Sequence, residues 1–120
     1  MKSLLKITLF FSVLLAFSSM KSAKLQDDIS ATIKVSGVCS MCKNRIEEAL
    51  YVAGIKSAIW DSKTQLLTVT YKSKKINELK IHELVSGVGH DTEKVKAKDE
   101  TYKNLPDCCL YRDGATMHKD

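Results

Sequence analysis

The chain has 120 residues, which is the length of one domain and leaves little room for a second. Apolar residues make up 44% and charged residues 28%, so a disordered or collagen-like chain is excluded. Aromatic residues are only 7%, which argues against a large aromatic ligand pocket. The formal net charge of +5 would suit a nucleic-acid partner, but three of the lysines lie in an N-terminal segment that we expect to be removed.

Residues 1–23 have the three-part layout of a secretory signal peptide. The apolar run 7–17 is too short to span a bilayer, which takes about 20 residues, so an uncleaved membrane anchor is the less favoured alternative. Cleavage fits after Ser18 or after Ala23. The second site leaves 16 basic residues against 14 acidic ones, a net charge of +2. We therefore expect a secreted or periplasmic protein with no membrane span after cleavage and no nucleic-acid partner.

The following residues predict strands and helices in the order βαββαβ. Apolar and polar residues alternate over 29–36, which is typical of a half-buried strand. Helical spacing follows over 42–53, and then a hairpin over 55–71 whose first strand has the imperfect alternation of a bulge. Helical spacing returns over 76–88, and a weaker edge strand is predicted over 90–97. This order predicts an α+β, ferredoxin-like fold: a four-stranded antiparallel sheet with two helices on one face.

Cys39 and Cys42 form a CxxC pair between the first strand and the first helix. Two thiols at this spacing can point at one ion about 2.3 Å from each sulfur, and we expect neither to belong to the core. The helix N-terminus and the nearby Lys43 and Arg45 favour thiolates, which select soft ions: chiefly Cu(I), and also Zn(II) or Hg(II). A disulfide and a thiol–disulfide oxidoreductase site are the alternatives that the spacing leaves open.

Residues 98–120 form a polar C-terminal tail with an apolar patch around Cys108 and Cys109. We expect this tail to dock on the domain. Adjacent Cα atoms lie about 3.8 Å apart, below the ~4.4–6.8 Å of an ordinary disulfide, so a bond between these two cysteines would be strained. Their expected partners are therefore the CxxC, a metal ion or another chain, and two reduced thiols in a docked tail are the alternative.

The segment VSGVCSMCKNRIEEAL, residues 35–50, resembles the heavy-metal-associated domain of small copper chaperones, periplasmic mercury-binding proteins and metal-pumping ATPases. The similarity covers residues 29–97. It continues in the segments 54–58, 67–71 and 88–91. The resemblance implies the βαββαβ fold and places the family's two metal-binding thiols on Cys39 and Cys42. The family usually has a methionine two residues before the first cysteine; here that residue is Gly37, so we expect a more mobile loop.

Histidines and a methionine are the other candidate soft ligands. The resemblance implies that His90 lies in a loop beside the CxxC, where a neutral imidazole can be a third ligand; an exposed loop histidine is the alternative. We predict His82 on the solvent side of the second helix. Met117 and His118 stand near the end of the chain, where fraying is the simpler expectation.

Together these features favour a metallochaperone or metal buffer that carries Cu(I), or a similar heavy-metal ion, and gives it to a metal-transporting ATPase or another efflux component. We expect no enzyme, because the sequence offers no set of nucleophile, base and oxyanion donors. The alternative is a small periplasmic dithiol–disulfide oxidoreductase on the same CxxC. Thioredoxin-like sites usually also have an aromatic residue before the CxxC and a cis-proline loop. Here Val38 precedes the CxxC, and the one proline, Pro106, follows the last predicted strand.

Overall fold

The computed structural model describes residues 28–114. The elements, in chain order, are β1 (Asp28–Lys34), α2 (Ser40–Glu48), β2 (Ile55–Asp61), β3 (Leu66–Lys72), α3 (Glu78–Ser86), α4 (Asp99–Lys103) and the short 3-10 helices η1 (Asp107–Cys109) and η2 (Tyr111–Asp113). The predicted signal peptide and its cleavage sites, and Met117 and His118, lie outside the described residues. Within residues 28–114, no helix has the length and apolar character needed to cross a membrane.

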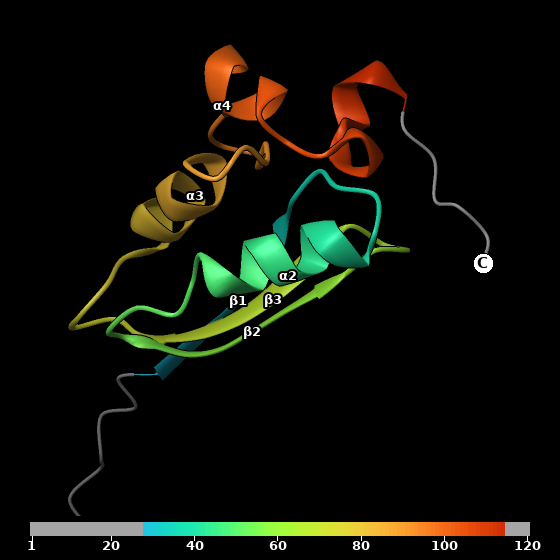
Figure 1. Cartoon of the computed structure of the whole chain (residues 1–120). Helices are drawn as coiled ribbons and strands as arrows, with labels where there is room; N and C mark the ends of the chain where they lie inside the picture. Colours follow the sequence, from blue (N-terminus) through green and yellow to red (C-terminus); the bar gives the residue numbers. More distant parts are fainter. Residues whose placement is uncertain (1–27, 115–120) are drawn as a thin grey trace, which may run out of the picture.

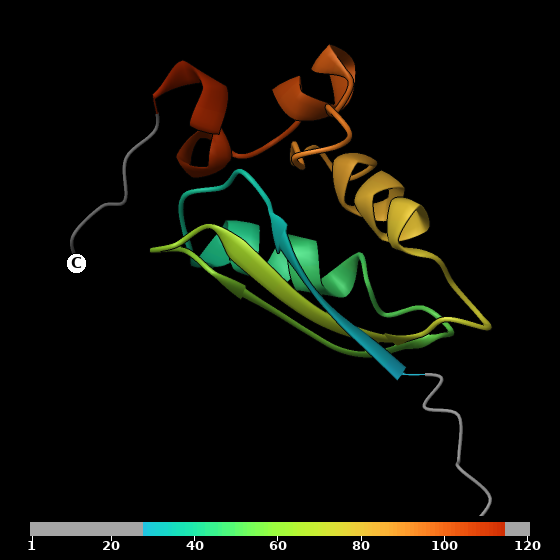
Figure 2. The same cartoon turned by 180° about the vertical axis from the view of Figure 1, so that it is seen from behind.

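The three strands form an antiparallel sheet in the order β1-β3-β2. Leu67 of the central strand lies opposite Ile33 on one side and Trp60 on the other, so these three side chains share one face of the sheet. β2 has a register shift between Ile55 and Ser57, which is the bulge that its imperfect alternation predicted. Helices α2 and α3 both lie on the same side of the sheet (Figures 1 and 2).

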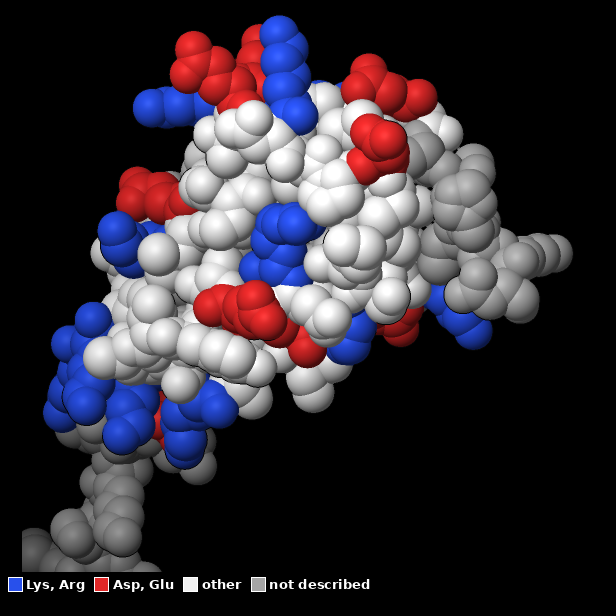
Figure 3. All heavy atoms as spheres, in the orientation of Figure 1, with Lys and Arg blue, Asp and Glu red and all other residues white. Residues whose placement is uncertain are grey.

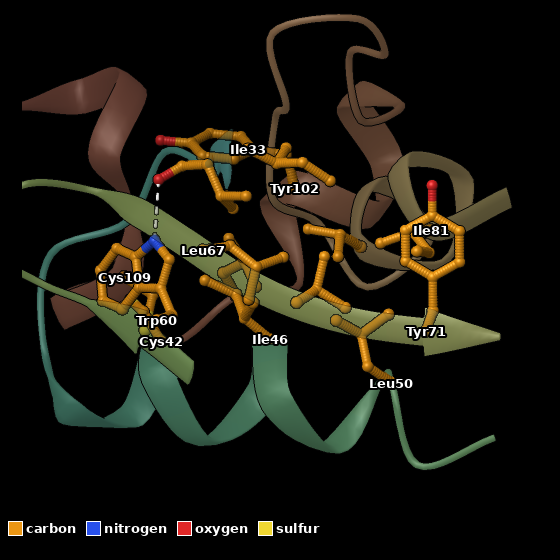
Figure 4. Packing of buried hydrophobic residues seen from close by; sticks show 14 residues of the cluster. Ile33, Cys42, Ile46, Leu50, Trp60, Leu67, Tyr71, Ile81, Tyr102 and Cys109 are labelled. Carbon is orange, nitrogen blue, oxygen red and sulfur yellow. Dashed lines mark hydrogen bonds between the residues drawn. The ribbon is translucent and has the colours of Figure 1, made fainter. Parts of the chain in front are cut away.

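The core lies between the sheet and the two helices (Figure 4). Nine bulky residues at the inward positions of the predicted strands and helices have side chains less than 5% exposed, whereas Ile29, near the start of β1, is 42% exposed. The nine are Ile33, Val35, Leu67, Val69, Tyr71, Ile46, Leu50, Ile81 and Val85. Each such burial stabilises the fold by about 1.5–3 kcal/mol relative to an exposed side chain. The periodicity in the sequence therefore predicted which faces pack together.

Helix α2 ends at Glu48, earlier than the predicted 53. The amides of Leu50 and Tyr51 donate to carbonyls three residues back, both at 3.1 Å, so the chain tightens into a turn. Helix α3 begins after Asn77, whose side chain accepts the amide hydrogen of Lys80 at 2.8 Å. This cap satisfies one of the donors that the first turn of a helix leaves without a partner.

The predicted fourth strand, over 90–97, is wrong: the described sheet has three strands. Only one antiparallel bridge, between Val35 and Thr92, remains of it. Beyond that bridge, Asp91 Oδ1 accepts the amide hydrogen of Ala97 at 2.7 Å, and Thr92 Oγ1 accepts a backbone amide three residues on at 3.0 Å. Such bonds from side chain to backbone offer the chain an alternative to a ladder, and here they fold the segment into turns.

The prediction that His82 faces solvent is also wrong, since its side chain is fully buried. Its Nδ1 lies 2.6 Å from Thr92 Oγ1, and its Nε2 lies 3.4 Å from Glu78 Oε1. The segment that contains Thr92 covers this side of α3, so a helix face that looks polar in the sequence becomes an interior one.

Residues 99–113, which we call the C-terminal cap, pack on the domain through the buried side chains of Tyr102, Leu105 and Cys109. Gly89 permits the approach: its φ is +106°, and a Cβ there would lie 2.9 Å from Leu105 Cδ2. Burial raises the pKa of Tyr111 to about 12, and the Tyr111 hydroxyl donates to the Gly89 carbonyl at 2.7 Å. The predicted docking of the tail is therefore observed for the part of it that the structure describes.

Arg112 fastens the C-terminal cap to the loop after α3. Its Nη2 lies 2.7 Å from Asp91 Oδ1 and its Nε 3.1 Å from Asp91 Oδ2, in a bidentate pair. Nη2 also donates to the Ala97 carbonyl at 2.7 Å, and the guanidinium lies 4.4 Å from the centre of the Tyr102 ring. One side chain thus ties the end of the cap to two places on the domain and to the start of the cap.

Candidate metal centre

The loop between β1 and α2 holds Cys39 and Cys42 at the start of the helix. Cys39 is the N-cap residue, with extended backbone at φ −126° and ψ 179°, and Cys42 lies in the first turn. The two sulfurs are 3.7 Å apart, and the amide of Val38 donates to Cys42 Sγ at 3.4 Å. The pair therefore lies at the amide end of a helix, where negative charge is stabilised. Cys42 is fully buried in the core cluster, so the expectation that neither thiol belongs to the core is wrong for Cys42.

Trp60 fills the space beneath this loop. A Cβ at Gly37 would lie 2.9 Å from two ring carbons of Trp60, so no larger residue fits there. The indole Nε1 donates to the Val35 carbonyl at 3.0 Å (Figure 4), and the side chain is 1% exposed. A residue of β2 thus occupies the volume next to the loop that a side chain at position 37 would need. Sequence analysis missed this role of Trp60, for which the one signal was a glycine in place of the family's methionine.

The C-terminal cap brings two further thiols to the loop. Cys108 Sγ lies 3.4 Å and Cys109 Sγ 3.6 Å from Cys39 Sγ, and the two cap sulfurs are 3.9 Å apart. All three sulfurs lie within 4.8 Å of one another. Figures 1 and 2 show η1 beside the loop that leads into α2. The sequence left open whether the cap cysteines meet the CxxC, a metal ion or another chain, and the structure places them beside the CxxC. All four cysteines are free thiols.

The hydrogen bonds of this cluster concentrate negative charge on Cys39. Burial raises the pKa of Cys39, but the hydrogen bond from the backbone amide of Cys42 and the hydrogen bonds shared with the neighbouring thiols outweigh burial, so the pKa falls to about 7. The pKa of Cys108 is raised mainly by the hydrogen bond between its sulfur and that of Cys39, and the pKa of Cys109 is raised mainly by burial. Arg45 Nη1 lies 3.5 Å from Cys109 Sγ. The cluster therefore holds one readily ionised thiol, Cys39, beside the two cap thiols of Cys108 and Cys109, whose raised pKa values favour the protonated form.

His90 is fully buried, so the alternative of an exposed loop histidine is wrong. Its Nδ1 lies 2.8 Å from the Ser36 carbonyl and must carry the hydrogen, because a carbonyl only accepts. Burial lowers the pKa of His90 and outweighs the hydrogen bond to the Ser36 carbonyl, which raises it, so the structure favours the uncharged ring. Nε2 has no hydrogen-bond partner among the described residues, and the ring stacks on Tyr111 with centroids 5.6 Å apart. His90 thus ties its own loop to the CxxC loop and lies outside the group of three close sulfurs.

A comparison with protein families matches residues 32–91, half of the chain, to the Heavy-metal-associated domain. The chain belongs to this family. No curated protein matches the chain. Among solved structures, the heavy-metal-associated domain found here is similar to the CopZ metallochaperone, at 24% identity and a TM-score of 0.52 over 53% of this chain and 98% of that one. It is also similar to a copper-binding domain of HMA7, a P-type ATPase, at 24% identity and a TM-score of 0.52 over 53% of this chain and 89% of that one. At these identities, the likeness concerns the fold.

The matched heavy-metal-associated domain ends at Asp91. Cys39 and Cys42 lie within it, and so does His90, whereas Cys108 and Cys109 lie beyond it. The heavy-metal-associated domain is a metal-binding module, and its loop carries the two thiols that sequence analysis placed there. The cap thiols are an addition by this chain to the matched region.

Proposed function

We propose that this heavy-metal-associated domain carries Cu(I) on Cys39 and Cys42, as a metallochaperone or metal buffer. The observation that carries the proposal is the pair of thiols 3.7 Å apart at the N-terminus of α2. Soft thiolates select Cu(I), with Zn(II) and Hg(II) as the other ions that suit them. Because ligands must lose their protons before they bind, Cu(I) affinity should fall as the pH falls. The ion moves on and off by exchange of thiolate ligands, and no covalent bond of a substrate is made or broken.

The proposed location is the periplasm or the exterior of the cell, supported by the signal-peptide layout of residues 1–23. The proposed recipient is a metal-transporting ATPase or another efflux component that offers thiolates of its own. Basic side chains gather where β3 leads into α3 (Figure 3), and this end of the molecule includes the exposed Lys72, Lys74 and Lys75. It lies at the opposite end of the sheet from the CxxC loop (Figure 1), so attraction to this cluster would not bring a recipient's thiols to the CxxC.

The test is a Cu(I) competition titration of the reduced mature chain against a chromogenic Cu(I) chelator. Cys39→Ser should lose tight 1:1 binding, because Cys39 is the thiol that the other three surround. Ser40→Ala, at the exposed neighbouring position, is the matched control and should bind as the native chain does. If Cys39→Ser retains tight 1:1 binding, the site lies elsewhere and the proposal fails.

The second candidate is a dithiol–disulfide oxidoreductase on the same CxxC. It is favoured by the pKa of about 7 of Cys39, since a thiolate at neutral pH is the attacking species in thiol–disulfide exchange. Reduction of insulin disulfides, measured beside the Cu(I) titration, separates the two candidates. High turnover together with weak Cu(I) binding would reverse their order.

A further inference from the structure

Cys39 is the centre of the thiol cluster, because the sulfurs of Cys42, Cys108 and Cys109 all lie between 3.4 and 3.7 Å from its own. We propose that Cys39, Cys108 and Cys109 form a three-thiolate site for one Cu(I) ion, and that Cys39 is shared between this site and the Cys39–Cys42 pair. The proposal rests on the proposed function for its cation. It adds two ligands, Cys108 and Cys109, from outside the region that matches the family.

The distances within this triangle of sulfurs suit a three-coordinate ion. Its sides are 3.4, 3.6 and 3.9 Å, so its centre lies about 2.1 Å from each sulfur, close to the distance of about 2.3 Å at which thiolates hold Zn(II). An ion would fit about 1 Å above the plane, or within it after the sulfurs move apart by a few tenths of an ångström. A linear two-coordinate ion needs sulfurs about 4.6 Å apart, whereas Cys39 and Cys42 are 3.7 Å apart. A third thiolate therefore suits the present geometry better than a linear pair does.

The surroundings also compensate the charge of such a site. Three thiolates around Cu(I) have a net charge of −2, which must be balanced where water is excluded. Arg45 directs its guanidinium at Cys109, and the N-terminus of α2 directs its amides at the side of Cys39 and Cys42. Cys109 is fully buried, so this thiolate is shielded from water and from oxidants in solution.

The C-terminal cap holds its two thiols in place before any metal binds. Cys109 lies in η1, between the buried Leu105 and the Arg112 pair with Asp91. These ligands therefore lose their conformational freedom when the chain folds and not when the ion binds, which favours metal binding. When the ion comes from the Cys39–Cys42 pair, loading the site transfers the protons of Cys108 and Cys109 to solvent and forms two Cu–S bonds. The Cu–S bond to Cys42 breaks with its electron pair left on the Cys42 sulfur, and the bond to Cys39 remains. The cap therefore turns an open carrier site into a closed storage site.

The decisive measurement is copper-edge X-ray absorption of the reduced mature chain with one equivalent of Cu(I). We expect three sulfur neighbours in the native chain and two, from Cys39 and Cys42, in the double variant Cys108→Ala/Cys109→Ala. Competition titration should show at least a tenfold loss of affinity in the double variant, with 1:1 binding kept. Met41→Leu is the matched control: Met41 Sδ lies 3.5 Å from Cys108 Sγ, and the variant should keep three sulfurs and the native affinity.

Each other outcome overturns one of the two proposals. Two sulfurs in the native chain, or three in the double variant with unchanged affinity, would overturn the three-thiolate site and leave the proposed function standing. If the double variant does not bind Cu(I) tightly, the Cys39–Cys42 pair is not a site by itself and the proposed function is overturned. If the native chain nevertheless shows three sulfur neighbours, the three-thiolate site stands. Circular dichroism confirms that each variant is folded. If the alanine pair is unfolded, the isosteric pair Cys108→Ser/Cys109→Ser takes its place.

Discussion

Arg112 fastens the C-terminal cap to the loop after α3, and Arg112→Gln should loosen the cap. The guanidinium loses its bidentate bonds to Asp91 and its bond to the Ala97 carbonyl. Both partners of the ion pair are largely shielded, with side chains 19% and 22% exposed, so the pair is stronger than a surface ion pair. The cap should therefore undock more often in the variant, while the sheet and α2 keep their packing.

The size of the effect follows from these contacts. Charge-assisted hydrogen bonds at this degree of burial contribute about 2 kcal/mol, and the contact of Arg112 with the Tyr102 ring adds about 0.5–1 kcal/mol. The bond to Asp99, whose side chain is 76% exposed, adds little. The undocked population should therefore rise roughly 70- to 150-fold, which corresponds to about 2.5–3 kcal/mol.

Labelling of Cys109 in the metal-free reduced chain measures this population. The side chain is fully buried, so a maleimide reaches it only when the cap opens, and the rate is proportional to the open fraction when closing is fast. Pulse labelling with peptide mass spectrometry separates Cys109 from the other thiols. Lys56→Gln, which removes an exposed ion pair with Asp28, is the control and should change the rate less than about twofold. A rate in Arg112→Gln within threefold of the native rate would refute the assignment of the cap's stability to Arg112.

Three further outcomes are expected. An aspartate ordinarily has a pKa of about 3.9. Burial raises the pKa of Asp91, but the hydrogen bonds from Arg112 and the Ala97 amide outweigh burial and hold this pKa below that ordinary value. Ionised Asp91 therefore stabilises the fold fully above about pH 4–5, and this stabilisation is lost as the pH falls through the lower pKa of Asp91 in the folded state. The free energy of unfolding should show this acid dependence, and Asp91→Asn should make it weaker. Trp60→Phe loses the bond to the Val35 carbonyl and leaves space beneath Gly37, so urea unfolding should show a loss of about 1–3 kcal/mol, and an unchanged midpoint would contradict this packing. His90→Ala should change Cu(I) affinity at most about tenfold, roughly 1.4 kcal/mol, because His90 holds the loop backbone through one hydrogen bond; a loss comparable to that of Cys39→Ser would make it a ligand.

The sequence predicted the elements whose evidence is local. The alternation over 29–36, the helical spacing after Cys42 and the hairpin over 55–71 each depend on neighbours along the chain, and β1, α2 and the β2–β3 pair follow them. The bulge in β2 was visible for the same reason. These patterns report which face of an element is apolar, and one core between a sheet and two helices is the arrangement that buries all of those faces.

The tertiary structure decided what depends on contacts between distant segments. The strand predicted over 90–97 gave way to turns because Asp91 and Thr92 have side-chain acceptors within reach of their own backbone. His82 was predicted on the solvent side of its helix, and an exposed loop was one of the two expectations for His90. The segments that bury these two side chains are recognisable as covers only once the chain has folded. Thr92 contacts His82, and the Tyr111 ring of the cap stacks on His90.

The thiol cluster shows most clearly the difference between what local sequence patterns predict and what contacts between distant segments decide. The CxxC and its place at the start of a helix follow from spacing, and the sequence alone also indicated that the adjacent Cys108 and Cys109 would seek partners other than each other. It could not choose among those partners, because Cys39 and Cys108 are 69 residues apart and local patterns do not reach that far. The choice is made by the packing of Leu105 against Gly89, the bond of Tyr111 to the same glycine and the pair of Arg112 with Asp91, which together set the cap over the CxxC loop.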